Sequence, residues 1–82
     1  MTEQEIYKII VETISEILDD KGLDVPEITP ETEILGDDLG IDSLDLATMV
    51  SDLEGRIGHD PFEKGFIEFK TVGELTKLYA QK

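Results

Sequence analysis

Large apolar residues recur every three or four positions near the start of the chain, with acidic and polar residues between them. This spacing places the apolar side chains on one face of a helix. Thr2 and Glu5 form a capping-box pattern, in which each side chain can accept a hydrogen bond from the other residue's backbone N–H. Gly22 suits the left-handed conformation that often follows a helix. We therefore predict an amphipathic helix that begins after Thr2 and ends at residues 19–22. Its apolar face consists of Ile6, Ile9, Ile10, Ile14, Ile17 and Leu18.

The next segment, residues 23–41, lacks helical periodicity. Two prolines and two glycines interrupt it, and residues of these types favour turns and loops. Unstructured connections of this length are uncommon in compact domains and are usually functional. We predict a long ordered loop with a short turn around Pro30, whose apolar residues tuck beneath the helices. These residues are Leu23, Val25, Ile28, Ile34, Leu35 and Leu39.

A second amphipathic helix is predicted over about 43–57. Asp42 or Ser43 can cap its first turn, and Asp45 completes a capping box with Asp42. Glycine costs up to about 1 kcal/mol relative to alanine inside a helix, so the glycines at the end of this pattern allow the helix to fray near Arg56. The residues expected to be buried are Leu46, Val50, Leu53 and Ile57, with Ala47 and Met49 at the edges of this face.

A short helical element is expected next, over residues 59–62 and those that follow. Pro61 suits the first position of a helix, and Gly65 limits the length of this one. Phe66, Ile67 and Phe69 alternate incompletely with polar residues, as in a strand. Because a single strand in a small helical protein has nothing to pair with, we interpret them as a loop that fills the core.

The last helix is predicted to open at the capping-box pair Thr71 and Glu74 and to run to Lys82. Val72, Leu75, Leu78 and Tyr79 lie on one face of it. The whole pattern predicts an all-α fold over a single domain, residues 1–82. We expect a four-helix bundle of three long helices and one short helix, with a long ordered loop between the first and second.

Length and charge limit what this chain can do. A chain of 82 residues buries only about 60% of its unfolded surface, which disfavours an enzyme with a deep active site. Its net charge of −13 disfavours nucleic acid and anionic membranes as partners and favours basic protein surfaces. The chain has no cysteine, no apolar run long enough to span a membrane and no basic, apolar signal peptide. We expect a cytoplasmic monomer that binds other proteins.

Ser43 is the candidate reactive residue, but catalysis by it is improbable. A nucleophilic serine needs a base within about 3 Å. His59, the single histidine, follows the far end of the predicted helix, roughly 20 Å away. The aspartates around Ser43 do not have the spacing of a calcium-binding loop, because a serine stands where the invariant glycine belongs and no bidentate glutamate follows. We therefore predict neither serine hydrolysis nor a dedicated metal site.

The string Asp-Leu-Gly-Ile-Asp-Ser-Leu-Asp, residues 38–45, resembles the phosphopantetheine attachment site of acyl carrier proteins. The likeness extends from about Ile6 to Tyr79. It implies that a phosphopantetheinyl transferase takes phosphopantetheine from coenzyme A and attaches it to Ser43. The terminal thiol of this arm would then carry acyl groups as thioesters to fatty-acid, lipid or polyketide-type biosynthetic enzymes. The protein would be a carrier, with no catalytic residues of its own.

Two further sets of residues follow from this interpretation. No lysine or arginine occurs from Gly22 to Gly55, whereas acidic residues accumulate around Ser43 and along the second helix. This charge predicts docking to basic grooves on the transferase and on acyl-loading and acyl-processing enzymes. The expected docking residues are Asp38, Asp42, Leu44, Asp45, Met49, Asp52 and Glu54. The candidates for lining an acyl pocket are Leu46, Val50, Leu53, Phe62 and Ile67.

Departures from the fatty-acid carriers point to a specialised carrier. Thr48 stands where they usually have glutamate, Gly55 and Arg56 interrupt their acidic helix end, and residues 59–62 replace their acidic third helix. An aminoacyl or peptidyl carrier is an alternative, although its motif more often has glycine or a hydrophobic residue before the serine. An unmodified acidic interaction domain is the remaining alternative.

Overall fold

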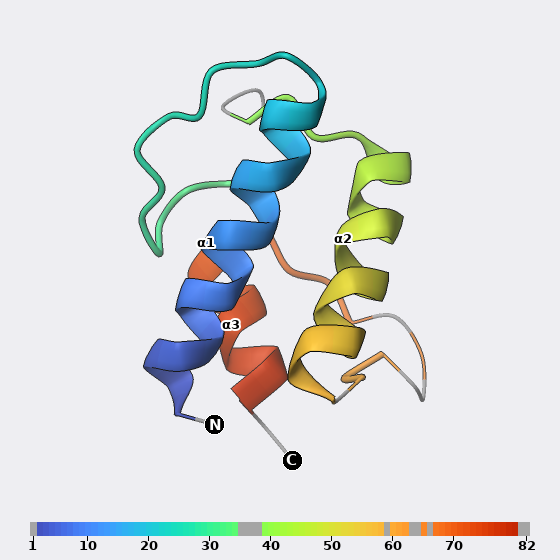
Figure 1. Ribbon diagram of the computed structural model, residues 1–82. Helices are drawn as coiled ribbons and strands as arrows, with labels where there is room; N and C mark the ends of the chain where they lie inside the picture. The colour runs from blue at the N-terminus through green and yellow to red at the C-terminus, as the bar shows by residue number, and fades with distance from the viewer. Residues whose placement is uncertain (1, 35–38, 59, 63–64, 66, 81–82) are drawn as a thin grey trace.

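Three α-helices form the regular structure of the part of the chain that the computed structural model describes, which is residues 2–34, 39–58, 60–62, 65 and 67–80. They are α1 (Glu3–Asp20), α2 (Ser43–Ile57) and α3 (Val72–Ala80). Figure 1 shows α1 and α2 side by side and running in opposite directions, with α3 against their lower halves. Both α2 and α3 pack on α1. The all-α class is confirmed.

The caps predicted for α1 are present. The Thr2 side chain accepts a hydrogen bond from the Glu5 backbone N–H at 3.1 Å, and the Glu5 carboxylate accepts one from the Thr2 backbone N–H at 3.3 Å. The bond from the Thr2 N–H, together with one from the Thr2 hydroxyl, holds the pKa of the Glu5 carboxyl below its usual value. At the other end, Lys21 is the C-cap, and Gly22 adopts the left-handed conformation with a φ of 75°. Local sequence therefore determines both ends of α1.

α2 begins and ends where the apolar pattern predicted. Asp42 is its N-cap, and the capping box with Asp45 is complete. Gly58 follows the helix in the left-handed conformation, with a φ of 81°, and its N–H donates to the Glu54 carbonyl. The helix therefore continues past Arg56 before it stops.

α3 has a modified form of the predicted cap. The Glu74 backbone N–H donates to the Thr71 hydroxyl at 3.2 Å, as expected, but the Glu74 carboxylate accepts from the backbone N–H of Lys70 at 3.3 Å, one residue before Thr71. The helix ends at Ala80, and the predicted end at Lys82 lies outside the described residues.

The core consists of apolar side chains from all three helices and from the connecting segments. Phe69, between α2 and α3, is 3% exposed, which confirms that it fills the core. Ile67 is 45% exposed, so the prediction that it also fills the core is wrong, and Phe66 lies outside the described residues. The buried apolar residues are Ile6, Ile10, Ile14, Ile17, Leu18, Ile34, Leu39, Ile41, Leu46, Met49, Leu53, Phe69, Val72, Leu75 and Tyr79.

The long loop is held by backbone hydrogen bonds to the segment before α3. The N–H of Ile34 donates to the Lys70 carbonyl at 2.8 Å, that of Val72 to Thr32 at 3.0 Å, and that of Gly73 to Pro30 at 2.8 Å. Glu33 and Thr71 form an isolated antiparallel bridge. This bridge involves Thr71, and residues 67–70 form no strand, as expected for a loop.

The loop's apolar residues divide into two groups. Ile34 and Leu39 are buried and Ile28 is half-buried, as predicted, whereas Leu23 and Val25 are 44% and 45% exposed. The first part of the loop curves away from α2 after α1 ends (Figure 1). Leu35 lies outside the described residues. The turn expected around Pro30 is closed by a 3.0 Å bond from the Thr32 N–H to the Thr29 carbonyl.

The short helix expected after Pro61 is not present where the chain is described. Pro61 and Phe62 form a turn, and the Gly65 N–H donates to the Phe62 carbonyl at 3.0 Å. The Asp60 side chain accepts from the Phe62 N–H at 2.9 Å, which stabilises this turn. Residues 59, 63, 64 and 66 lie outside the described chain.

Candidate functional site

Ser43 is the first residue of α2 and is exposed to solvent. By sequence, either Asp42 or Ser43 could cap this helix. The structure assigns the cap to Asp42, whose side chain accepts from the Asp45 N–H at 2.9 Å and whose carbonyl accepts from the Leu46 N–H at 2.9 Å. The Ser43 hydroxyl is therefore not needed for capping and remains accessible for modification.

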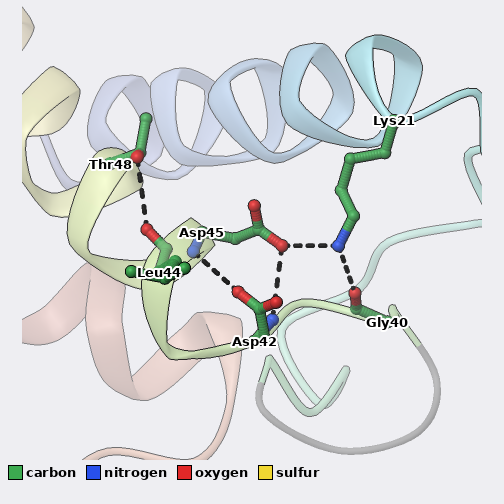
Figure 2. Close-up of polar contacts among 6 residues, drawn as sticks. All are labelled: Lys21, Gly40, Asp42, Leu44, Asp45 and Thr48. Atoms are coloured by element: carbon green, nitrogen blue, oxygen red, sulfur yellow. Dashed lines mark hydrogen bonds and ion pairs between the residues drawn. The ribbon is translucent and has the colours of Figure 1, made fainter.

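A lysine from α1 lies beside this serine-containing turn. Figure 2 shows the Lys21 ammonium between the Asp45 carboxylate and the Gly40 carbonyl. Its Nζ donates to Asp45 Oδ2 at 2.5 Å and to the Gly40 oxygen at 2.9 Å. The same Asp45 oxygen also accepts from the Asp42 N–H at 3.4 Å, which completes the capping box. The end of α1, the end of the long loop and the first turn of α2 therefore meet at one ammonium group.

This ion pair shifts the pKa values of both partners. The hydrogen bond to Asp45 raises the pKa of the Lys21 ammonium above its usual value. The hydrogen bond from Lys21, with help from Asp42, lowers the pKa of the Asp45 carboxyl. Each group is therefore held in its charged form over a wider pH range than in an isolated side chain.

Sequence reasoning missed Lys21. Residues 22–55 contain no lysine or arginine, and Asp45 was expected to complete a capping box and to act as a docking acid. The residue just before that range provides the local positive charge. The signal was available, because Lys21 is the only lysine or arginine between Lys8 and Arg56. Its partner could not be identified, because 24 residues separate Lys21 from Asp45 along the chain.

The other docking candidates have different environments. Leu44 is 79% exposed, next to Ser43, and its carbonyl accepts from the Thr48 hydroxyl at 3.2 Å. Asp42, Asp52 and Glu54 are exposed, and Asp38 lies outside the described residues.

Met49 requires a correction. It was expected at the edge of the buried face and on the docking surface, but its side chain is fully buried in the core. Met49 lies three residues after Leu46 and four before Leu53, so all three share one face of α2, and this face packs on α1 and the loop. A partner protein cannot contact Met49 in this conformation.

The five pocket candidates do not share one environment. Leu46 and Leu53 are buried, Val50 and Phe62 are half-buried against the core, and Ile67 is 45% exposed. The Phe62 ring lies 5.9 Å from that of Phe69 and 6.2 Å from that of Tyr79, measured between ring centroids. Aromatic side chains therefore close the core beneath the segment that follows α2.

Two surface clefts lie at the opposite end of the molecule, where α1 begins. Their volumes are about 540 and 680 Å³, and both include Gln4 and Tyr7. Tyr7 lines both and donates from its hydroxyl to the Ile28 carbonyl at 3.1 Å. Neither cleft includes Ser43 or a pocket candidate.

The described residues contain no cluster of three or more histidine, cysteine or acidic side chains that could hold a metal ion. In the same part of the chain, no helix is long and apolar enough to cross a membrane. His59, which we excluded as a base for Ser43, lies outside the described residues.

Comparison with known proteins gives the family. Residues 8–79 match the family described as "Phosphopantetheine attachment site". The acyl carrier protein of Thermotoga maritima is 33% identical over 81 residues, which cover 99% of this chain and 95% of that protein. The acyl carrier protein of Saccharopolyspora erythraea is 36% identical over 78 residues, or 95% of this chain and 78% of that protein.

A solved structure agrees with this relationship. MacpD is an acyl carrier protein of Pseudomonas fluorescens involved in mupirocin biosynthesis, and its solution structure matches with a TM-score of 0.83 and 32% identity. The match covers 98% of this chain and 72% of MacpD. The chain belongs to the family of phosphopantetheine-binding carriers. It is an acyl carrier protein, which carries acyl groups on a phosphopantetheine arm.

Proposed function

We propose that the phosphopantetheine arm is attached to Ser43 and that this protein acts as a carrier without catalysis of its own. The observation that carries the proposal is the exposed hydroxyl at the start of α2, where Asp42 forms the cap and leaves Ser43 free. The motif around this serine and the family match both support the assignment.

The position suits a phosphodiester. The N-terminus of a helix carries a partial positive charge and attracts an anion by about 0.3–1 kcal/mol. Asp42 and Asp45 oppose this attraction, although Lys21 offsets the charge of Asp45. The terminal thiol of the arm supplies the thioester chemistry, and Ser43 holds the arm where it can leave the surface.

The exposed acids around Ser43 are proposed to dock basic partner proteins. These partners would be the phosphopantetheinyl transferase and the acyl-loading and acyl-processing enzymes. Leu44 supplies an apolar contact next to the attachment site, since most of its side chain is exposed. The proposed docking residues are Asp38, Asp42, Leu44, Asp45, Asp52 and Glu54.

An acyl pocket is proposed between α2 and the segment that follows it. Val50 and Phe62 support this location, because both are only half-buried and pack against the core. Entry of an acyl chain requires Phe62 to move from its contacts with Phe69 and Tyr79. The proposed lining is Leu46, Val50, Leu53, Phe62 and Ile67.

Localisation, oligomeric state and pathway complete the proposal. We infer a cytoplasmic monomer that serves a specialised pathway. The departures at Thr48, Gly55 and Arg56 support the specialised role. The similarity to MacpD, which is involved in mupirocin biosynthesis, supports it further.

Substitution of Ser43 by alanine tests the attachment site. The purified chain is incubated with coenzyme A and a broad-specificity phosphopantetheinyl transferase, and its intact mass is measured. We expect the unsubstituted chain to gain one phosphopantetheine and Ser43→Ala to gain none. Because Ser43 is exposed and does not cap α2, the change should alter stability by no more than about 0.5 kcal/mol.

Ser51→Ala is the matched control, because Ser51 is also exposed on α2. It should be modified like the unsubstituted chain. An adduct on Ser43→Ala would assign the arm to another residue. Failure of the unsubstituted chain to accept the arm would contradict the proposed function itself.

A further inference from the structure

Lys21 is the positively charged group at the end of the molecule that holds Ser43. It bridges the Asp45 carboxylate and the Gly40 carbonyl (Figure 2). In the 47 residues from Ile9 to Gly55 it is the only lysine or arginine, whereas that stretch contains 14 aspartates and glutamates. Its charge therefore has a strong local effect on the field around α2.

The pairing is accessible from solvent. The side chains of Lys21 and Asp45 remain 33% and 22% exposed, and ion pairs of this kind contribute little to stability. A basic side chain of an approaching protein can therefore replace Lys21 on Asp45 without a large loss of stability in the carrier. Asp45 Oδ2 remains bonded to the Asp42 N–H, so the start of α2 keeps its cap during the exchange.

The same lysine also acts at a distance. Electrostatic attraction between complementary surfaces raises association rates, and a like charge within the docking surface lowers them. Lys21 directly follows α1 as its C-cap, and its side chain reaches Asp45 in the first turn of α2. It therefore faces the same partner surface as Asp45.

We propose that Lys21 is a specificity-determining residue that competes with basic partner proteins for Asp45. The inference rests on the proposed docking of partners to the acids around Ser43. A partner that places a cation on Asp45 either displaces Lys21 from Oδ2 or meets a carboxylate whose charge Lys21 already offsets. A partner that docks through Asp52 and Glu54 alone does neither. Lys21 therefore slows the first kind of partner more than the second.

An alternative role for Lys21 makes the opposite prediction. If its main effect were to hold the loop and α2 in the geometry that partners recognise, removing it would slow association. Competition instead requires that removing it speeds association. The two roles are therefore distinguished by the sign of one rate change.

The experiment measures association of the carrier with the transferase by stopped flow at an ionic strength of about 10 mM, where the Debye length is about 30 Å. Lys21→Gln should associate about threefold faster than the unsubstituted chain. Lys8→Gln is the matched control, because Lys8 is exposed on α1 far from Ser43 and its loss also changes the net charge from −13 to −14. Lys8→Gln should increase the association rate less than Lys21→Gln does. Lys21→Arg should retain the original rate.

A double substitution tests whether the effect depends on Asp45. In a chain that already carries Asp45→Asn, Lys21→Gln should change the rate no more than Lys8→Gln does. At an ionic strength of 1 M, where the Debye length is about 3 Å, Lys21→Gln and Lys8→Gln should associate at the same rate. Thermal midpoints and circular dichroism verify that the variants remain folded.

A Lys21→Gln rate equal to or below that of Lys8→Gln would overturn the inference. In the Asp45→Asn background, a larger rate increase from Lys21→Gln than from Lys8→Gln would also overturn it. Either result leaves the attachment of phosphopantetheine to Ser43 intact, because the final mass of the modified chain is recorded in the same reaction. Absence of any modification would instead contradict the proposed function.

Discussion

At the scale of single residues, Tyr79 has an unusual environment. Its side chain is 2% exposed, and its buried hydroxyl has no hydrogen-bond partner in the described part of the chain. Phe62 meets its ring edge to face, at an interplanar angle of 84°. Burial raises the pKa of the Tyr79 hydroxyl well above its usual range, and the negative charges of Asp60 and Glu54 add to this shift. Burying a polar group without a partner opposes folding.

We expect Tyr79→Phe to stabilise the protein at pH 7 by about 1 kcal/mol, because it removes the unpaired hydroxyl and keeps the ring. For a domain of this size the midpoint should rise by roughly 4–8 °C. Tyr7→Phe is the matched control. It should lower the midpoint, because the Tyr7 hydroxyl donates to the Ile28 carbonyl. Thermal unfolding measures both. A fall in the midpoint of Tyr79→Phe would show that the hydroxyl has a stabilising partner.

The effect of Tyr79→Phe on stability depends on pH. The folded-state pKa of Tyr79 lies above the unfolded value of about 10, so the unfolded chain loses this proton first. The stability linked to neutral Tyr79 is therefore fully present below pH 10 and is lost as the pH rises through the folded-state pKa. Tyr79→Phe should lose less stability than the unsubstituted chain between pH 9 and pH 11.

Residue-level prediction succeeded where the interacting groups are close in sequence. The capping boxes at Thr2 and Asp42 follow from pairs three residues apart, so their chemistry can be read directly from the sequence. Lys21 and Met49 could not be placed this way. The first depends on a partner 24 residues away, and the second depends on which face of α2 packs on α1.

At the scale of elements, the sequence predicted the bounds of α2 but not how the loop is held. The helix ends are determined by Asp42 and Gly58, which act on adjacent backbone groups. The loop instead bonds to residues 70–73, roughly 40 positions further along the chain. No local pattern specifies this pairing, and only three bonds and one bridge define it, so it lacks the repeated alternation of a strand.

We propose that an acyl chain enters between α2 and the segment that follows it. Each buried methylene contributes up to about 0.8 kcal/mol, so partial burial of an octanoyl chain should stabilise the domain by a few kcal/mol. For a domain of this size, each kcal/mol of stabilisation raises the thermal midpoint by roughly 4–8 °C. The octanoyl form should therefore melt at a higher temperature than the free-thiol form. Differential scanning calorimetry measures this difference. An acetyl form is the control, and it should melt close to the free thiol.

The outcome also reports on Phe62, which packs against Phe69 and Tyr79. Equal melting of the octanoyl and free-thiol forms would mean that these rings keep the chain outside. In that case the pocket proposal fails, and the cargo is carried exposed to solvent.

At the scale of the whole molecule, like charges repel one another over the surface. The chain carries 20 acidic and 7 basic residues, and its two described ion pairs, Lys21–Asp45 and Arg56–Glu16, are both partly exposed. Salt weakens such pairs, but it also weakens the much more numerous repulsions between acids. The net effect should favour the folded state.

We therefore expect the thermal midpoint to rise when NaCl is increased from 10 mM to 500 mM. Scanning calorimetry at pH 7 measures it. KCl at the same ionic strength is the control and should give the same rise, because the effect comes from screening. A midpoint that falls with either salt would show that the two ion pairs outweigh the repulsion.

The bonds between the long loop and residues 70–73 also affect when the carrier becomes usable during synthesis. The loop leads into α2 and Ser43, yet three backbone bonds that fix it require residues 70–73, which are made after Ser43. While a ribosome is still making the chain, the serine emerges before the segment that secures its approach. A transferase that reads the native surface around Ser43 is therefore expected to act only after residues 70–73 have left the ribosome.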